Sequence, residues 1–327
     1  SGSVDPRLPA ARWSERGADR RAANVIGMPA PEKSPLFSAA FLHALERLSL
    51  APRRAVDGRH RAELRSRRAG SSLEFAEHRS YAFGDDPRSL DWNAYARLDR
   101  LFVKLFHDEE AIAVNVLLDG SNSMRCPIVG GSERSRWDHG RLLTGAFAYV
   151  ALAGQHEVSL GVFGETLGAR LGPVRGRAKF HDVLAFLKRD NLPRGGTSLT
   201  QSVTDVRGRR QMIVVISDFA DSSDTERSLK KLARRGFDVV VVRVFDPAED
   251  GRGLDGDLLV VDSETGEEIP VSGSRISVSE RALSNEAAAQ ALRALCRASA
   301  FGFYDASCAV EPTAMLVELE RSGALRR

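Results

Sequence analysis

Cysteine is scarce in this sequence, and its few copies are scattered. Cys126, Cys296 and Cys308 are the three cysteines in a chain of 327 residues. An odd and unclustered set shows neither the spacing of a zinc site nor a framework of disulfide bonds. This usage is typical of reducing compartments, so the cytoplasm is the expected location.

Long apolar runs are also missing. No stretch approaches the ~18 consecutive apolar residues of a membrane-spanning helix, and the chain does not start with the apolar core of a signal peptide. Hydrophobic residues make up 43% and charged residues 28%, as in globular proteins. A net charge of +3 is too small to indicate a class of partner. We therefore expect no transmembrane segment, and one main domain with a smaller attachment.

Three common catalytic patterns are absent as well. The seven histidines are scattered, without the paired spacing of a zinc protease. Gly195 and Gly196 are not followed by the lysine of a phosphate-binding loop, and Ser121 has no evident histidine and acid to activate it. The sequence therefore indicates none of these three enzyme classes.

The chain does contain a polar loop directly after an apolar run. Residues 112–118 have the pattern of a buried strand, and Asp119-Gly120-Ser121-Asn122-Ser123 follows them as D-x-S-x-S. Open α/β sheets bind ligands at the carboxyl ends of their strands. The carboxylate and the two hydroxyls supply only oxygen, which suits Mg²⁺ or Mn²⁺. The short pattern is frequent by chance, so its significance depends on context.

Two later segments supply that context. Gly195-Gly196-Thr197-Ser198 reads as a tight turn before a helix, and residues 212–217 read as a second buried strand that ends on Asp218. This order resembles the metal-ion-dependent adhesion site of von Willebrand factor A domains. The resemblance implies that Mg²⁺ or Mn²⁺ is held by Asp119, Ser121, Ser123, Thr197 and Asp218. The alternative is a set of helix caps and turns, which favour the same residue types.

The charge of such a site indicates what it does. Two carboxylates balance a divalent cation, and neutral hydroxyls add no charge. The cation keeps an electrophilic open position, which an acidic side chain of a partner protein fills better than water. We therefore expect a recognition device and not an enzyme.

A second and more specific resemblance lies upstream. The block contains Gly70-Ser71-Ser72-Leu73-Glu74-Phe75, His78-Arg79-Ser80-Tyr81 and Gly84-Asp85-Asp86-Pro87-Arg88-Ser89-Leu90-Asp91-Trp92. It resembles the bacterial family called domain of unknown function 58, whose members pair this block with an A-type fold. The resemblance extends from about residue 36 to the C-terminus. It implies an adaptor or co-chaperone of a MoxR-type AAA+ ATPase, with a client protein that offers an acidic side chain to the metal.

The hydrophobic pattern predicts an α/β fold. Apolar strands alternate with amphipathic helices, which indicates a doubly wound, mostly parallel sheet covered on both faces, as in von Willebrand factor A domains, with a smaller β-rich satellite domain. The expected strands are 112–118, 158–163, 212–217, 239–245 and 301–304. The expected helices are 138–153, 179–188, 199–206, 225–235, 285–298 and 312–321. We expect disorder in residues 1–35, a helix and the satellite in 36–110, and the α/β domain in 111–327 with an inserted β-hairpin near 257–272.

Aromatic residues of the upstream block are expected in its core. Trp92 in particular is expected to be buried at a joint between the satellite and the α/β domain. Its neighbours would form ion pairs there, with Arg79, Arg88 or Arg97 facing the acids of residues 84–91. On this interpretation, Trp92→Ala would cost ~3–5 kcal/mol of stability.

Two other classes of function stay open. A Mg²⁺ bound by Asp119, Ser121 and Asp218 could polarise a phosphoester, although no general base or phosphate cradle is evident. Residues 53–68 contain seven arginines against two acids, a pattern that can bind nucleic acid or a membrane surface. That stretch lacks aromatic residues to stack on bases. A solvated helix, or a contact with the chain's own acidic residues, is the more ordinary interpretation, and we expect no nucleic-acid partner.

Overall fold

The computed structural model describes the chain in two compact units. It covers residues 11–15, 37–50, 74–82, 90–107, 111–125, 134–164, 167–189, 198–204, 211–247, 256–262, 268–273 and 275–326. Residues 56–111 form the smaller unit, and the remainder forms the larger one. Each unit is described by itself.

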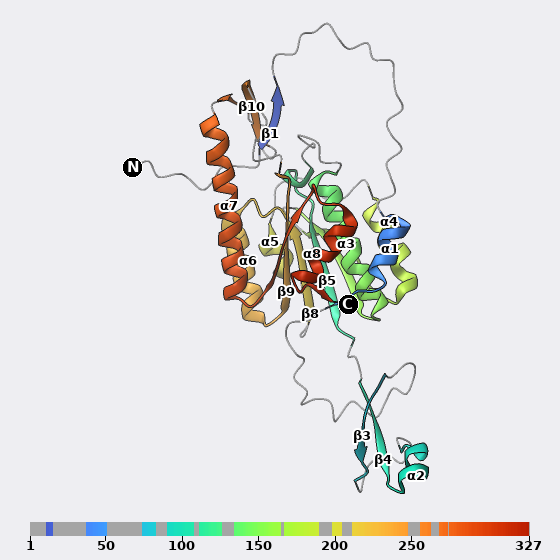
Figure 1. The fold of residues 1–327 in the computed structure, drawn as a ribbon. Coiled ribbons are helices and arrows are strands. Elements are labelled where there is room, and N and C mark those ends of the chain that lie inside the picture. The colour runs from blue at the N-terminus through green and yellow to red at the C-terminus, as the bar shows by residue number, and fades with distance from the viewer. Residues whose placement is uncertain are drawn as a thin grey trace, which may run out of the picture. The chain divides into compact units, whose positions relative to one another are not determined.

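A six-stranded sheet forms the centre of the larger unit (Figure 1). Its spatial order is β12 (Gly302–Ser307), β9 (Asp238–Phe245), β8 (Gln211–Ser217), β5 (Ala113–Asp119), β6 (Glu157–Phe163) and β7 (Leu167–Arg175). Neighbouring strands are parallel except for the antiparallel edge pair of β6 and β7. The central strands are nearly continuous apolar runs because both of their faces are covered. The predicted α/β fold with a mostly parallel sheet is confirmed.

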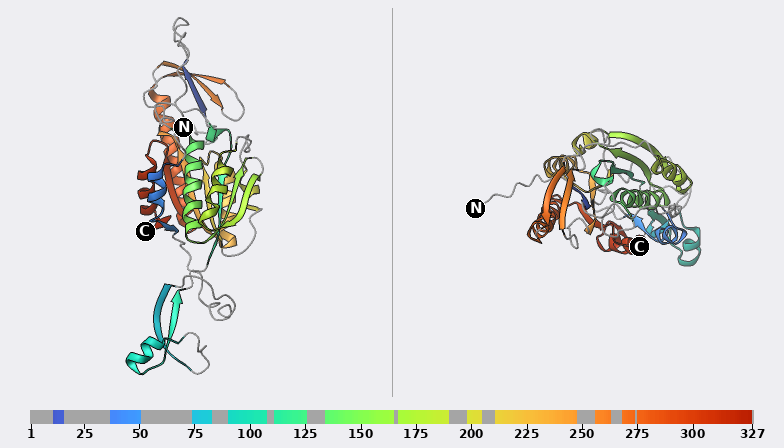
Figure 2. Two further views of the ribbon diagram at one scale, coloured as in Figure 1. Left: turned by 90° about the vertical axis from the view of Figure 1, so that its right-hand side faces the viewer. Right: turned by 90° about the horizontal axis from the view of Figure 1, so that it is seen from above.

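Helices cover both faces of this sheet (Figures 1 and 2). One face carries α1 (Ala39–Leu45), α3 (Arg136–Ala153), α4 (Phe180–Leu187) and α8 (Pro312–Arg321). The other carries α5 (Leu199–Thr204), α6 (Ser222–Arg235) and α7 (Arg275–Ala298). Side chains of β5 alternate between the two layers, since Val116 and Leu118 join the first and Leu117 the second. None of the described helices is both long and apolar enough to cross a membrane.

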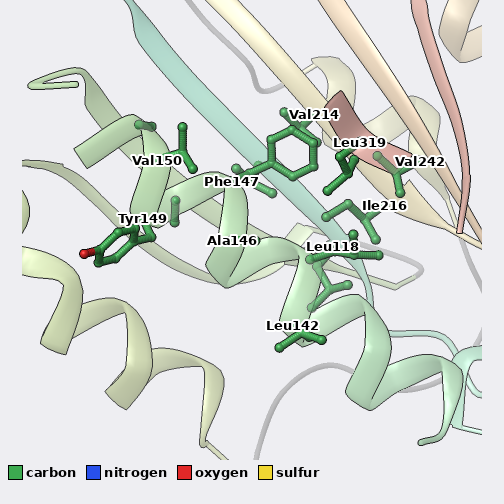
Figure 3. Packing of buried hydrophobic residues seen from close by; sticks show 14 of the residues in the cluster. Leu118, Leu142, Ala146, Phe147, Tyr149, Val150, Val214, Ile216, Val242 and Leu319 are labelled. Atoms are coloured by element: carbon green, nitrogen blue, oxygen red, sulfur yellow. The ribbon is translucent and has the colours of Figure 1, made fainter. Parts of the chain in front are cut away.

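Helix α3 supplies much of the first layer. Ser135 caps the helix, because its hydroxyl oxygen accepts a hydrogen bond from the Asp138 N–H. Phe147 is fully buried, and Figure 3 shows it beside Val214 of β8 and Leu319 of α8. This helix also begins next to the loop that follows β5, so its packing positions the candidate site.

Helix α1 belongs to the larger unit. Phe41 and Leu45 are 1% and 0% exposed and join the core of the first layer. The short strand β2 (Ser49–Leu50) pairs with the C-terminal strand β13 (Leu325–Arg326). The sequence analysis placed this helix with the satellite, whereas the apolar face of α1 is buried on the α/β core. The smaller unit starts near residue 56 instead of residue 36.

A second sheet is built on the insertion between β9 and α7. Strands β10 (Gly256–Asp262) and β11 (Glu268–Gly273) form the antiparallel hairpin where the sequence predicted one. Strand β1 (Ala11–Glu15) pairs with β10, although composition predicted disorder there. Local composition did not indicate this strand because its pairing partner is distant in the sequence. Residues 1–10 and 16–36 lie outside the described residues.

The smaller unit is described as a hairpin and one helix. Strands β3 (Glu74–Ser80) and β4 (Phe102–His107) pair antiparallel, with α2 (Trp92–Leu98) between them in sequence. Asp91 caps this helix, because its Oδ1 accepts the N–H groups of Asn93 and Ala94. The basic residues 53–68 and the turn at 84–87 lie outside the described residues, so the proposed ion pairs stay predictions.

Trp92 is not buried, and the prediction that it forms part of a core is wrong. Its side chain is 62% exposed, and it makes an edge-to-face contact with Tyr95, itself 41% exposed. Both rings lie on the open side of α2, one turn apart. A helix that packs on one face leaves its other face in solvent, and an apolar residue type does not by itself show on which face the residue lies.

We therefore expect Trp92→Ala to lower the free energy of unfolding by less than about 1 kcal/mol, as for other exposed positions. Urea denaturation measures this change. Val103→Ala is a matched control in the same unit, because Val103 is only 5% exposed and its loss should cost more. A loss of ~3 kcal/mol or more for Trp92→Ala would show that the ring is covered after all.

Candidate functional site

The candidate site lies where the order of the strands reverses. From β5 the chain proceeds through β6 to β7, and from β8 it proceeds the other way through β9 to β12. At such a point the connections diverge to opposite faces, and ligands bind outside the carboxyl ends of the two strands. Asp119 is the last residue of β5, and Asp218 follows directly after β8. The topology therefore brings these two predicted residues to one edge of the sheet.

Asp119 is fully buried, and its carboxylate is held from two directions. Its Oδ1 accepts the Ser121 N–H at 2.8 Å, and its Oδ2 accepts the Ser217 hydroxyl at 2.6 Å. Burial raises the pKa of Asp119 to about 7, and the nearby charge of Asp218 acts in the same direction. Ionising this carboxyl group is costly without a compensating positive charge.

The two serine hydroxyls of the loop converge. Ser121 Oγ and Ser123 Oγ lie 2.9 Å apart, and their residues are 0% and 1% exposed. The loop is anchored to β6 by the Gly120 N–H, which donates to the Phe163 carbonyl at 2.7 Å. A short 3₁₀ turn (Ser123–Arg125) continues from the loop. These contacts turn both hydroxyls to the same side of the loop.

Asp218 completes the acidic part of the site. Its side chain is only 6% exposed, and its Oδ1 accepts the Ala220 N–H at 3.3 Å. Its Oδ2 is buried and receives no hydrogen bond from the described residues. This oxygen faces a buried guanidinium, so a cation would have to share it with that positive charge.

Arg136 is a member of the site that the sequence analysis missed. Its Nη1 lies 3.3 Å from Asp218 Oδ2, and its Nη2 donates to the Ser123 carbonyl at 2.6 Å. It is the first residue of α3, where the helix dipole disfavours a positive charge. The sequence did contain a signal for this role: a basic residue directly after a helix N-cap is unfavourable unless an acidic residue lies nearby.

Thr197 lies outside the described residues, together with Gly195 and Gly196. The description resumes at Ser198, whose N–H donates to the Gly164 carbonyl at 2.8 Å, just beyond the end of β6. Asp224 then caps α5 by accepting the N–H groups of Leu199 and Thr200. The segment after Thr197 is thus anchored at the same edge of the sheet. The role of Thr197 as a ligand stays a prediction.

A small cavity adjoins the acidic residues. It measures about 50 Å³ and is lined by Leu199, Ser217, Phe219, Ala220, Asp221, Asp224 and Thr225. Ligand pockets for metabolites span roughly 300–1,000 Å³. This cavity accommodates water molecules but no nucleotide. A large ligand would therefore bind at the surface of this edge of the sheet.

The donors present fit a hard divalent cation. Two carboxylates and two hydroxyls offer only oxygen, the ligand type that Mg²⁺ and Mn²⁺ prefer. Within the described ranges no group of three or more His, Cys, Asp or Glu residues could hold a metal. A cation here would therefore depend on the serine hydroxyls and on Thr197. When bound, it would supply positive charge to the two buried carboxylates and a position for a further oxygen ligand.

We expect the affinity for Mg²⁺ to increase with pH between about 6 and 8. The folded-state pKa of Asp119, about 7, lies above the ordinary value of 3.8, so at pH 6 a proton occupies the group and must leave before a cation binds. The apparent affinity should fall roughly tenfold per pH unit below 7 and level off above it. Calorimetry at several pH values, in two buffers of different ionisation enthalpy, also counts the proton released. An affinity that does not change with pH would contradict the raised pKa.

Two mycobacterial relatives match most of the chain. Uncharacterized proteins from Mycobacterium bovis and Mycobacterium tuberculosis are each 23% identical to it over 262 residues, which covers 76% of this chain and 78% of each relative. Among solved structures, the conserved hypothetical protein BatB from Bacteroides thetaiotaomicron aligns with a TM-score of 0.37 and 16% identity, over 65% of this chain and 98% of that one. An aerotolerance-related membrane protein from Bacteroides fragilis aligns with a TM-score of 0.33 and 18% identity, over 57% and 98%.

A family profile identifies the chain more directly. The profile described as protein of unknown function DUF58 matches residues 77–292, which is more than half of the chain. The match includes most of the hairpin of the smaller unit, the loop after β5 and the end of β8, so it contains every described residue of the candidate site. By this match, the chain belongs to the DUF58 family.

Proposed function

We propose that this protein is a non-enzymatic, cation-dependent protein-interaction module. The observation that carries the proposal is the meeting of buried Asp119 and Asp218 with the paired hydroxyls of Ser121 and Ser123 at the reversal of strand order. In our proposal this is a metal-ion-dependent adhesion site on a von Willebrand factor A-like fold. The strand order and the single antiparallel edge strand support that assignment.

The chemistry of the site supports recognition over catalysis. A divalent cation bound to the site would attract an acidic side chain from another protein, through a charge-assisted bond. Among the described residues, the adjoining cavity of about 50 Å³ does not itself enclose a phosphoester substrate. A partner surface, in contrast, needs only to present one carboxylate at the edge of the sheet.

For the partner we propose a MoxR-type AAA+ ATPase together with a client protein. The support is the resemblance of the upstream block and the α/β domain to DUF58 proteins, for which that pairing is expected. In this proposal the protein acts in the cytoplasm as an adaptor or co-chaperone. The acidic side chain of the ATPase or client completes the ligands of the cation.

A binding assay tests this function. The purified chain is immobilised, and binding of the MoxR-type ATPase is measured with Mg²⁺ and with a chelator. Asp119→Ala, Thr197→Ala and Asp218→Ala should each weaken binding about as much as the chelator does. Chelation should add nothing further in these variants, because both changes remove the same bond. Glu226→Ala is the control, since Glu226 is an exposed acid on α6 that pairs with Lys230.

Two results would contradict the proposal. Binding that is indifferent to the chelator would leave the cation, if present, with only a structural role. Mg²⁺-dependent hydrolysis of a phosphoester by the chain alone, abolished by Asp119→Ala, would favour an enzyme.

A further inference from the structure

Arg136 places a positive charge among the proposed ligands of the cation. Its guanidinium lies between the Ser123 carbonyl, which accepts a hydrogen bond from Nη2 at 2.6 Å, and Asp218 Oδ2, 3.3 Å from Nη1. The side chains of Arg136 and Asp218 are both 6% exposed. Because water screens such a buried pair poorly, this charge acts on the whole site.

The position of Arg136 is determined by the surrounding structure. It is the first residue of α3, directly after the N-cap Ser135. The next residue, Trp137, is 8% exposed and carries the Arg125 guanidinium on its ring at 3.9 Å. Burial of a charge at the positive end of a helix dipole is unfavourable unless a nearby acid compensates it. Asp218 is that acid, so the two residues form one unit.

A count of charges shows what Arg136 changes. Asp119 and Asp218 alone would neutralise a divalent cation, and the loaded site would carry no net charge. With Arg136 included and both carboxylates ionised, these three groups carry one negative charge before loading, and together with the cation they carry one positive charge. A site with one negative charge attracts a cation less strongly than a site with two. A loaded site with a net positive charge attracts a carboxylate more strongly than a neutral one.

We propose that Arg136 is a selectivity residue, which weakens the binding of the divalent cation and strengthens the binding of an acidic ligand to the loaded site. This inference rests on the proposed function, because it concerns the same cation site. It predicts effects of opposite sign on two ligands. A residue that merely supported the loop would affect both ligands in the same direction.

Mn²⁺ and acetate are suitable probes for the full chain. Water-proton relaxation follows the binding of Mn²⁺, and a subsequent titration with acetate follows the replacement of metal-bound water. Arg136→Gln should bind Mn²⁺ roughly tenfold more tightly than wild type, because a nearby positive charge is removed. The acetate affinity of the loaded variant should fall by a similar factor.

Further variants separate charge from structure. Arg136→Met retains an aliphatic stem without the charge and should behave like Arg136→Gln. Arg136→Lys retains the charge and should stay close to wild type for both ligands. Arg141→Gln is the control on the same helix, because Arg141 pairs with Asp138. Circular dichroism verifies that each variant is folded.

The outcomes distinguish this inference from the proposed function. If neutral variants bind Mn²⁺ no more tightly than wild type, or bind acetate equally well, the role of Arg136 is refuted while the cation site stands. If both affinities fall in both neutral variants, Arg136 has a structural role only. If wild type and all variants fail to bind Mn²⁺, the cation site is refuted and the inference with it.

Discussion

Asp119→Ala is expected to abolish the binding of Mg²⁺ and Mn²⁺ with little change in the fold. Asp119 is the fully buried carboxylate at the end of β5, and no other described acid lies on that loop. Its removal leaves Asp218, at the end of the neighbouring strand β8, as the one remaining carboxylate of the proposed ligands. Calorimetry measures the affinity directly. Equal affinity in wild type and variant would refute the assignment of the ligand.

Asp119→Asn provides a sharper version of the same experiment. Asparagine has the shape of aspartate and can still accept the Ser121 N–H, but it has no charge to bind a cation. Without a cation, a raised pKa contributes stability that is fully present below pH 3.8 and is lost as the pH rises through about 7. The variant does not ionise, so at pH 8 and without a cation it should be more stable than wild type.

The expected gain can be bounded from the pKa. A pKa of about 7 against an ordinary 3.8 corresponds to as much as about 4 kcal/mol, since a difference of one in pKa equals about 1.4 kcal/mol. At pH 5 the gain should fall to about 1.6 kcal/mol, because the carboxyl group is still mostly ionised in the unfolded chain until the pH falls below 3.8. Addition of Mg²⁺ should stabilise only wild type. Denaturation at both pH values, with and without Mg²⁺, measures all of these terms. A variant that is less stable than wild type at pH 8 would show that the carboxylate is structurally required.

Phe147→Ala is expected to lower the free energy of unfolding by ~3–5 kcal/mol, as for other buried aromatic residues. Phe147 is 0% exposed and belongs to the layer that joins α3 to β8 and α8. The surrounding sheet and helices are held by many other contacts, so they cannot close around the cavity that the substitution creates. Urea denaturation measures the loss.

Val317→Ala is the matched control for this substitution. Val317 lies on α8 but is 41% exposed, so its truncation should cost less than about 1 kcal/mol. A loss below about 1 kcal/mol for Phe147→Ala would mean that α3 contributes little to the core.

Local patterns predicted the central strands and most helices. The expected strand 212–217 is β8 (Gln211–Ser217), and the expected helix 312–321 is α8 (Pro312–Arg321). These elements were predictable because the central strands, apolar on both faces, form continuous apolar runs, and the helices, apolar on one face, repeat apolar residues at helical spacing. The edge strand β7 (Leu167–Arg175) was missed, because it contains two glycines, a proline and two arginines, and in the described sheet it pairs on one side with β6.

In the candidate site too, some residues were predictable from the sequence and others were not. The order of Asp119, Ser121, Ser123 and Asp218 was visible in the sequence, because each of them follows directly after a recognisable apolar strand. Arg136 was not predicted, because its role depends on the packing of α3 against the ends of β5 and β8. Trp92 was wrongly placed in a core, because its residue type suggested burial. In the structure it lies on an open side of α2 and is 62% exposed.

The sequence by itself determined the alternation of strands and helices, the doubly wound class and the oxygen-bearing side chains at the strand ends, since all of these follow from short-range patterns. The tertiary structure alone decided which ends meet, that β1 pairs with β10, and that a buried arginine shares Asp218 with the proposed cation. Contacts between segments far apart in the chain leave no local period, and burial and charge pairing arise only when those segments pack together.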